Sequence, residues 1–462
     1  MDGERVSEGG IDDLYARLKR FAHQFKDCFS RKPTHGHLLT YMAGQHSSLQ
    51  RKSIEPMALA ANVPPRTLQE FLGLSRWKHD LMRRRVLERV LQRHASPTAI
   101  ALIDETSFPK KGSKTAGVQR QHCGATGKTD NCVVAVYLGY ATAEFHALVD
   151  CDLYLPEKTW AENPERCKEA GIPDALKFRT KGQIALDLLR RSVAAGAVFK
   201  YLAADELYGS SSEFRAGVAE LGITYVVEVG RMTSGWTTKP RFEIPDSIHS
   251  DGRPRTRAFR TENTRAPRRV DRMWQRGGPS WKKYQIKETE KGPVVWEARA
   301  QRFWPSYRGQ ALEESWLLVA RNVMSGEVKY FISNAQPDAP LETLLHVAFS
   351  RAEVEQVFQA SKSEIGLDHF EVRHYLPLMR HLIVSLASLL FLEEETKRLR
   401  KKTAGGAYAR CARRPKRSLT GQSRAASENE GLSRPCAKSI IGSAAERNPQ
   451  PHTVEKQFAY CM

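Results

Sequence analysis

The segment PTAIALIDETSFPKKG, residues 97–112, decides the fold that we expect. Within it, Ala99 to Ile103 form a short apolar run that begins near a proline and ends at an acid, Asp104. A run of this kind is typical of a buried strand, with the acid at its carboxyl end. The alternative for Asp104 is an ordinary turn residue or helix N-cap.

A second segment, VFKYLAADELYG at residues 198–209, has the same pattern. Its apolar run from Phe199 to Ala204 again ends at an acid, Asp205. In open α/β sheets, sites form at the carboxyl ends of strands, so we expect the two carboxylates to lie close together. For either residue alone, a capping or turn role is an equally good interpretation.

The third segment, RAEVEQVFQASK at residues 351–362, is a predicted helix. Arg351, Glu355 and Lys362 are separated by four and seven residues, which places them on one helical face. An acid flanked by two cations suits a metal-binding carboxylate beside anionic phosphates. The alternative is a surface helix with ordinary charge pairs.

Two strand-end carboxylates and one helix carboxylate can together bind a pair of divalent metal ions. Oxygen ligands of this kind suit Mg²⁺ or Mn²⁺. Two such ions about 4 Å apart would hold the attacking and leaving oxygens of a phosphodiester displacement. The sequence therefore predicts a metal-dependent site at Asp104, Asp205 and Glu355.

In these segments the chain resembles the DDE transposases of bacterial insertion sequences. The helix follows the signature Tyr-x2-Arg-x3-Glu-x6-Lys of one large branch, except that Ala348 takes the Tyr position. Glu105 stands where many members have a second Asp, which keeps the charge. Further resembling segments lie in order across residues 55–390: IDETSFPKKG, GVQRQHCGATGKTDNCVVAVYL, LYLPEKTW, AADELYG and GLDHFEVR.

The resemblance implies an α/β fold with a ribonuclease-H-like catalytic domain, and DNA transposase activity with two Mg²⁺ or Mn²⁺ ions per active site. Asp104, Asp205 and Glu355 would be both catalytic and metal-binding. Arg351 and Lys362 would hold DNA phosphates near the cleavage site. The implied partner is double-stranded DNA, as transposon ends and as target, with a homodimer in the synaptic complex by analogy.

Two other functions stay open at this point. A catalytically inactive or domesticated DNA-binding protein derived from such a transposase would keep the same segments, although three intact acids argue against it. Another ribonuclease-H-like nuclease, such as a resolvase, usually lacks a long Trp-rich segment before the last acid. Spacing alone also does not exclude Asp150 and Asp152 as site acids, and Tyr208 and His122 are candidates to line the site.

The composition favours a polyanionic partner and a location inside the cell. The formal net charge is +20 and the pI is near 9.6. Residues 1–20 are polar, so we expect no secretory signal, and HLIVSLASLLFL at 381–392 is too short to span a bilayer and should be a buried helix. Eight Cys without a CxxC pair predict buried thiols, as at Cys123, Cys132 and Cys151, and a reducing location, the cytoplasm. The resemblance to transposases of bacterial insertion sequences implies a bacterial cytoplasm and a place near the nucleoid.

The N-terminal region, residues 11–98, is predicted to be helical and is a possible DNA-binding region. Its segment IEPMALAANVPPRTLQEFLGL has the pattern of a helix-turn-helix, with a proline opening the second helix. Arg66, Thr67 and Gln69 would then be exposed for phosphate or base contacts. An ordinary helical hairpin that packs on the catalytic domain is an equally good interpretation.

The remaining regions complete the predicted organisation. Residues 99–230 alternate strands and helices in an order that a ribonuclease-H-like core permits. Residues 231–340, with six of the eight Trp, are predicted to be a β-rich insertion that is rich in Arg, and residues 341–396 the catalytic helix and C-terminal helices. Residues 397–462 hold 15 Lys and Arg against 4 Asp and Glu and are predicted to be a disordered basic tail. Two interpretations of this tail are equally good: it adds non-specific DNA affinity, or it is an extension with no role.

Overall fold

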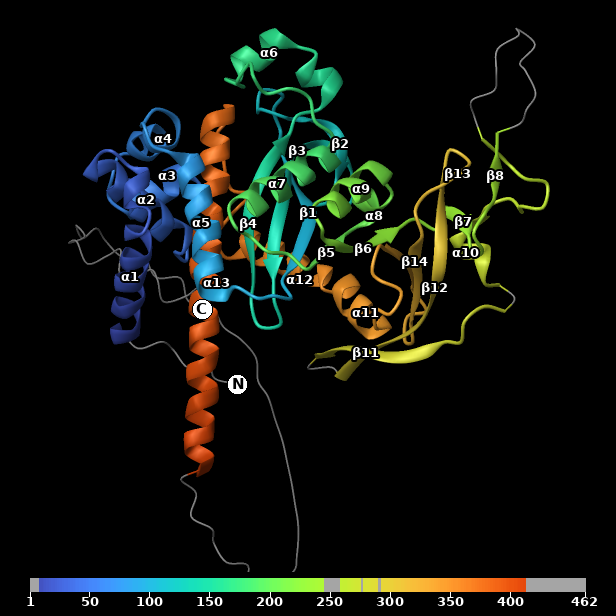
Figure 1. Cartoon of the computed structure of the whole chain (residues 1–462). Helices are drawn as coiled ribbons and strands as arrows, with labels where there is room; N and C mark the ends of the chain where they lie inside the picture. Colours follow the sequence, from blue (N-terminus) through green and yellow to red (C-terminus); the bar gives the residue numbers. More distant parts are fainter. Residues whose placement is uncertain (1–7, 245–257, 276, 290–291, 413–462) are drawn as a thin grey trace, which may run out of the picture.

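The computed structural model describes residues 8–244, 258–275, 277–289 and 292–412, and most of its strands join one mixed sheet (Figure 1). In the core of that sheet the strand order is β4–β3–β1–β5–β6. The strands of this part are β1 (Ile100–Pro109), β2 (Gln119–Cys123), β3 (Lys128–Ala141), β4 (His146–Tyr154), β5 (Tyr201–Ala204) and β6 (Thr224–Val229).

The strand directions in this core are mixed. β1 runs antiparallel to β3 and parallel to β5, and β5 runs parallel to β6. The apolar residues of β1 and β5 are buried on both faces, which is why their sequences are continuous apolar runs instead of alternating ones. The result is a mixed α/β fold with a large mixed sheet, consistent with a ribonuclease-H-like domain.

The strands between residues 231 and 340 continue the same sheet. β15 (Val328–Ser333) runs antiparallel to β6, and β14 (Ser315–Asn322) and β12 (Gly292–Tyr307) follow it in order. The smaller elements here are β7 (Ser234–Trp236), β8 (Phe242–Glu243), β9 (Phe259–Arg260), β10 (Arg268–Arg269), α10 (Val270–Met273), β11 (Lys282–Thr289) and β13 (Gln310–Ala311). The Trp-rich region is therefore hydrogen-bonded to the core through β6 and β15.

Helices cover both faces of the core sheet. α7 (Lys181–Ala194) contacts β3 and β4, and α12 (Arg351–Ser363) contacts β1 and β4. The two helices lie on opposite faces, because the neighbouring β1 residues Glu105 and Asp104 pair with α7 and α12 respectively. The other helices near the sheet are η2 (Glu157–Ala161), α6 (Pro164–Glu169), α8 (Glu206–Gly209), α9 (Ser212–Glu220) and α11 (Leu341–Phe349).

The N-terminal region is helical, as expected, and gathers around α13 (Tyr375–Ala412) (Figure 1). Its helices are α1 (Glu8–His23), η1 (Lys26–Cys28), α2 (Lys32–Gln45), α3 (Ile54–Ala60), α4 (Pro65–Gly73) and α5 (His79–His94). α2, α4 and α5 contact α13, and their apolar side chains join the same hydrophobic core as those of the sheet.

Helix α13 forms the centre of the helical part. Its segment 375–399 is long and apolar enough to cross a membrane, but 83% of the apolar window is buried inside the protein. The stretch at 381–392 is buried throughout, which confirms the expected buried helix. Two glutamates that closely follow this stretch, Glu394 and Glu395, anchor the neighbouring helices.

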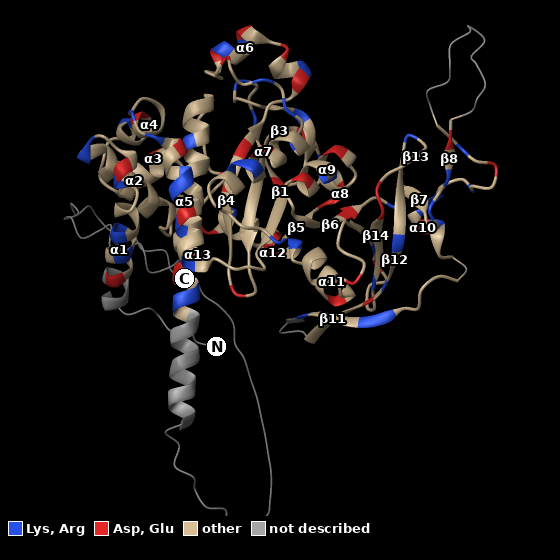
Figure 2. Ribbon diagram, in the orientation of Figure 1, with Lys and Arg blue, Asp and Glu red and all other residues tan. Residues whose placement is uncertain are grey.

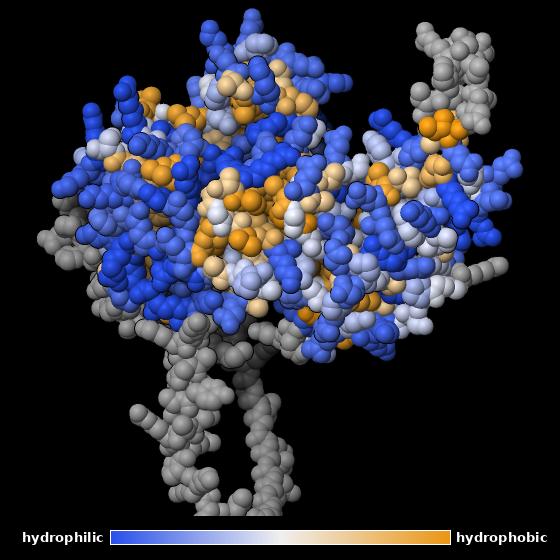
Figure 3. Space-filling view, viewed as in Figure 1, coloured by the Kyte–Doolittle hydropathy of each residue, from blue (hydrophilic) through white to orange (hydrophobic). Residues whose placement is uncertain are grey.

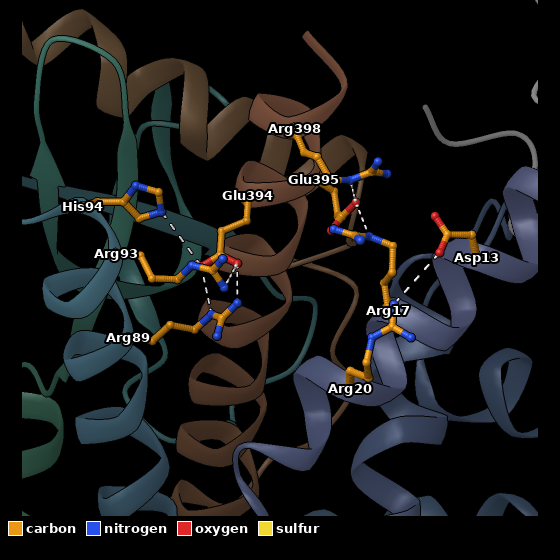
Figure 4. Close-up of polar contacts among 9 residues, drawn as sticks. All are labelled: Asp13, Arg17, Arg20, Arg89, Arg93, His94, Glu394, Glu395 and Arg398. Carbon is orange, nitrogen blue, oxygen red and sulfur yellow. Dashed lines mark hydrogen bonds and ion pairs between the residues drawn. The ribbon is translucent and has the colours of Figure 1, made fainter. Parts of the chain in front are cut away.

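These anchors are ion pairs between α13 and the helices α1 and α5 (Figure 4). The Arg89 guanidinium contacts both carboxylate oxygens of Glu394, with its Nε 2.8 Å from Oε1. Arg17 contacts Glu395 in the same way, with its Nε 2.8 Å from Oε1. Burial alone would raise the pKa of Glu394, but hydrogen bonds from His94 and Arg89 lower it below its usual value. Glu394 is therefore held as a charged group, and the ion pairs of Glu394 and Glu395 fix the N-terminal helices in place.

The charged surface is spread over both ends of the molecule. Figure 2 shows Lys and Arg on α1 and α5 and again along β11 and β12. The face seen in Figure 3 is mostly hydrophilic, with an apolar area over the region where Figure 1 places α7 and β4.

Two boundaries predicted from the sequence are wrong. β1 does not end at Asp104 but continues to Pro109, because it stays paired with β3 after β5 has ended. The predicted tail does not begin at residue 397, because α13 continues to Ala412. The rest of the tail prediction, residues 413–462, lies outside the described residues.

Candidate active site

The two strand acids are neighbours in the sheet. β1 and β5 are paired in register up to Ile103 and Ala204, so Asp104 and Asp205 follow at the same level. β5 ends there because Asp205 caps α8, and its Oδ1 accepts hydrogen bonds from the backbone N–H groups of Leu207 and, more distantly, Tyr208. The expected capping role and the expected site position thus belong to the same residue.

Helix α12 brings the third acid to this position. The Arg351 guanidinium places Nη1 3.2 Å from Asp104 Oδ2 and Nη2 2.8 Å from Glu355 Oε1. The helix is held over the sheet by buried apolar residues, including Phe358, whose ring packs against Tyr137 of β3 at 5.2 Å between centroids. The structure therefore brings the three predicted acids together around one arginine.

The acids carry more negative charge than Arg351 can balance. Burial raises the pKa of Asp104 to about 7; the Arg351 charge opposes this rise and the Asp205 charge adds to it. Burial, followed by the charge of Glu105, also raises the pKa of Asp205. A site of this kind gains free energy by taking up a further cation, since each bound positive charge stabilises the ionised acids.

The donor chemistry of the site fits a hard divalent cation. All three acids offer oxygen ligands, the type that Mg²⁺ and Mn²⁺ prefer. Within residues 8–412, as far as they are described, no three His, Cys, Asp or Glu form a ready-made ligand group. The reason here is that Arg351 stands between Asp104 and Glu355, while the Glu355 side chain is 57% exposed and has room to turn.

Glu105 lies next to Asp104 but on the opposite face of β1, and the sequence did not reveal its contacts. We expected only that it keeps a negative charge, but its Oε1 lies 2.5 Å from Lys181 Nζ and its Oε2 accepts a 2.6 Å hydrogen bond from the Tyr208 hydroxyl. Tyr208, a candidate to line the site, is fully buried, with its hydroxyl group on Glu105. The sequence could have indicated the contacts of Glu105 only through its place directly after Asp104, since neighbouring residues of a strand point to opposite faces of the sheet.

Lys362 lies apart from the three acids. It is in the last turn of α12, roughly 16 Å along the helix axis from Arg351. Burial lowers its pKa, and the nearby charge of Asp368 opposes that change. Among the described residues Lys362 forms no ion pair with the acids, so a phosphate contact by Lys362 would be made further along the DNA than one by Arg351.

The predicted helix-turn-helix residues are on α4, on the side of α13 away from β1 (Figure 1). Asn62, with a φ of 55°, makes the turn between α3 and α4. Arg66 and Gln69 are exposed and Thr67 is partly buried, and Arg66 Nε lies 2.7 Å from Glu70 Oε1.

Asp150 and Asp152 form ion pairs with arginines away from the three acids. Asp150 Oδ2 lies 2.8 Å from Arg191 Nε, and Asp152 Oδ2 lies 2.9 Å from Arg179 Nη2. Both acids join β4 to the α7 side of the sheet. His122 is exposed on β2, and Cys123, Cys132 and Cys151 are buried free thiols as expected.

Comparison with known proteins gives this site its class. The model of the DDE superfamily endonuclease family matches residues 24–293, more than half of the chain, and the chain belongs to that family. The match contains both Asp104 and Asp205 and ends before Glu355. It also confirms the family that the sequence resembled.

Among individual proteins, the chain is similar to the probable transposase for insertion sequence element IS701 of Microchaete diplosiphon. The two are 35% identical over 185 residues, which is 40% of this chain and 46% of the relative. The chain thus spans about half the length of the curated relative it matches.

Proposed function

We propose that this protein is a DNA transposase that binds insertion-sequence ends and catalyses divalent-metal-dependent strand cleavage and strand transfer. The observation that carries the proposal is the shared contact of Arg351 with Asp104 and Glu355, beside an Asp205 in register with Asp104. Residues from two strands and a distant helix meet there, and an ordinary charge pair on a helix surface does not require that.

Asp104, Asp205 and Glu355 are the residues that would hold the metal, as two Mg²⁺ or Mn²⁺ ions. When bound, such ions supply activation of the attacking hydroxyl and stabilisation of the leaving oxygen. Asp104 and Asp205 have fixed positions on the sheet, because Asp104 lies within β1, Asp205 directly follows β5, and these two strands are hydrogen-bonded to each other. Glu355 completes the set by turning its exposed side chain away from Arg351.

The cations of α12 would position the DNA backbone. Once Glu355 turns, one side of the Arg351 guanidinium is released, and its planar fork suits bidentate binding to a phosphate. Lys362 would bind a phosphate further along the strand as a point charge. Because Arg351 and Lys362 would bind different phosphates, they lie on the same helix without sharing an ion-pair network.

The partner of this site would be double-stranded DNA, both at the element ends and at the target, in the bacterial cytoplasm near the nucleoid. Arg66, Thr67 and Gln69 on α4 would contribute to end binding if the helix-turn-helix interpretation is right. A homodimer would hold two ends together in the synaptic complex, since each end needs one active site.

The test is metal-dependent cleavage of a duplex that carries the element end. Asp104→Asn, Asp205→Asn and Glu355→Gln should each lower cleavage by several orders of magnitude and leave end binding nearly unchanged. Glu353→Gln, on the same helix, is the matched control and should cleave normally. Normal cleavage by Glu355→Gln would refute the triad, and a wild-type protein that binds ends but never cleaves would be the inactive DNA-binding protein instead.

A further inference from the structure

The row of acids on neighbouring strands extends one strand beyond Asp104 and Asp205. β6 is paired in register with β5 up to Val227 and Ala204, so Glu228 follows beside Asp205 as Asp205 follows beside Asp104. Three adjacent strands thus present an acid at the same level. Neither the capping nor the metal interpretation of the triad uses Glu228.

Glu228 lies on the same sheet face as Asp104. It is paired with Phe331 of β15, and Phe331 packs against Phe349 of α11, the helix that directly precedes α12. Directly paired residues point to the same face of a sheet. The Glu228 charge also contributes to the raised pKa of Arg351, which places this acid within electrostatic reach of the site.

A lysine from the Trp-rich region neutralises Glu228. Lys329 Nζ lies 3.2 Å from Glu228 Oε1 and 3.1 Å from Oε2, with Glu327 Oε1 at 3.7 Å. The last paired residue of β6 is Val229, opposite Tyr330, so Lys329 stands just beyond the carboxyl end of β6. Asp104 of β1 and Asp205 after β5 lie at nearly the same level of the sheet.

Lys329 is accessible from solvent even though it forms an ion pair with Glu228. Its side chain is 23% exposed. An ammonium group has three donors, so two can stay on the Glu228 oxygens while the third points outward. A lone acid at this position would repel an approaching phosphate, whereas the pair offers it a positioned positive group.

We propose that Lys329 binds a DNA backbone phosphate adjacent to the cleaved bond, on the side of the Trp-rich region, and that Glu228 is the positioning residue for its ammonium. The inference rests on the proposed function, since it takes DNA as the substrate of the neighbouring acids. Lys329 would be the third cation, after Arg351 and Lys362, to contact the DNA strand near the acids. It would approach that DNA strand from the side opposite to Lys362.

The variants are Lys329→Ala, Lys329→Arg and Glu228→Gln in the full chain. The matched control is Arg321→Ala, which breaks a cross-strand ion pair with Glu297 (Nη2–Oε2 2.6 Å) in the same sheet. Arg321 is paired opposite Val328, the neighbour of Lys329, so it lies on the other face. Thermal unfolding of each variant shows whether the fold is intact.

The readout is a scan of duplexes in which single phosphates are replaced by neutral methylphosphonates. In the wild type, one replaced phosphate next to the cleaved bond should weaken binding and slow single-turnover cleavage about tenfold. Lys329→Ala should lose that sensitivity and cleave unmodified DNA about tenfold more slowly. Lys329→Arg should restore most of the sensitivity and most of the cleavage rate. Glu228→Gln should give values between those of the wild type and Lys329→Ala. Arg321→Ala should keep the wild-type profile.

An unchanged methylphosphonate profile in Lys329→Ala would overturn the inference and leave Lys329 as a structural ion pair. The binding half of the scan needs no chemistry, so it separates this inference from the proposed function. If the wild type binds but does not cleave, a binding profile that changes in Lys329→Ala, changes less in Glu228→Gln and stays the same in Arg321→Ala still supports the phosphate contact. If cleavage is normal and the profile is insensitive to Lys329, the transposase proposal stands and this contact falls.

Discussion

Asp104→Asn should stabilise the metal-free protein above neutral pH. Burial, although opposed by Arg351, raises the pKa of Asp104 from 3.8 to about 7. The folded protein therefore holds this proton more tightly than the unfolded chain, so the contribution of Asp104 to stability is full below about pH 4 and falls as the pH rises to about 7. A shift of this size corresponds to about 4 kcal/mol of unfolding free energy. Asparagine has nearly the same shape and carries no charge, so it should avoid that loss.

The assay is urea unfolding of the wild type and Asp104→Asn with a chelator present, from about pH 4 to pH 8. The two unfolding free energies should agree at the acid end, and the variant should be more stable by about 3–4 kcal/mol at the basic end. Added Mg²⁺ should then stabilise the wild type and not the variant, because the ion binds only the folded carboxylate site. A difference between the two proteins that does not change with pH would show that Asp104 ionises at its ordinary pKa, and the electrostatic reasoning would be wrong.

Three further outcomes follow from the described contacts. Lys362→Ala should lower bulk DNA affinity little and cleavage by about tenfold or more, because a misplaced phosphate no longer meets the acids; cleavage at the normal rate would remove its role. Truncation after Lys402 should weaken non-specific DNA binding and flatten its salt dependence while cleavage per bound complex survives, as filter binding across salt concentrations would show. Arg89→Ala should lower the unfolding free energy by about 2 kcal/mol, because Glu394 loses its bidentate partner but keeps two other basic groups nearby, and an unchanged melting temperature would contradict this.

The strands of the core could be predicted because their sequences are governed by burial. The runs that end at Asp104 and Asp205 are apolar throughout, since helices cover both faces there. The end of β1 could not be predicted in the same way. Residues 105–109 are strand only because β3 pairs with them, and a single sequence does not show which segment is the partner.

Contacts between distant segments were the harder part. The spacing of Arg351 and Glu355 predicted one helical face, and that pair is present, yet the contact from Arg351 to Asp104 depends on how α12 packs on the sheet. The pairing of β6 with β15 joins segments separated by the whole Trp-rich region, so nothing local indicates that the sheet is continuous. Glu105 was misjudged for a simpler reason, because its charge was considered without the direction in which a strand points it.

The continuity of the sheet sets a fixed spacing within the protein. From β5 to β12 there are four strand-to-strand steps, which is about 19 Å at the usual separation of hydrogen-bonded strands. Backbone hydrogen bonds across every step prevent the Trp-rich region from swinging independently of the acids. For a DNA end bound on β12, the distance to the acids would thus be fixed by the number of strands between them. Adding or removing a pair of strands there would move the cleavage position along the DNA by a fixed number of nucleotides.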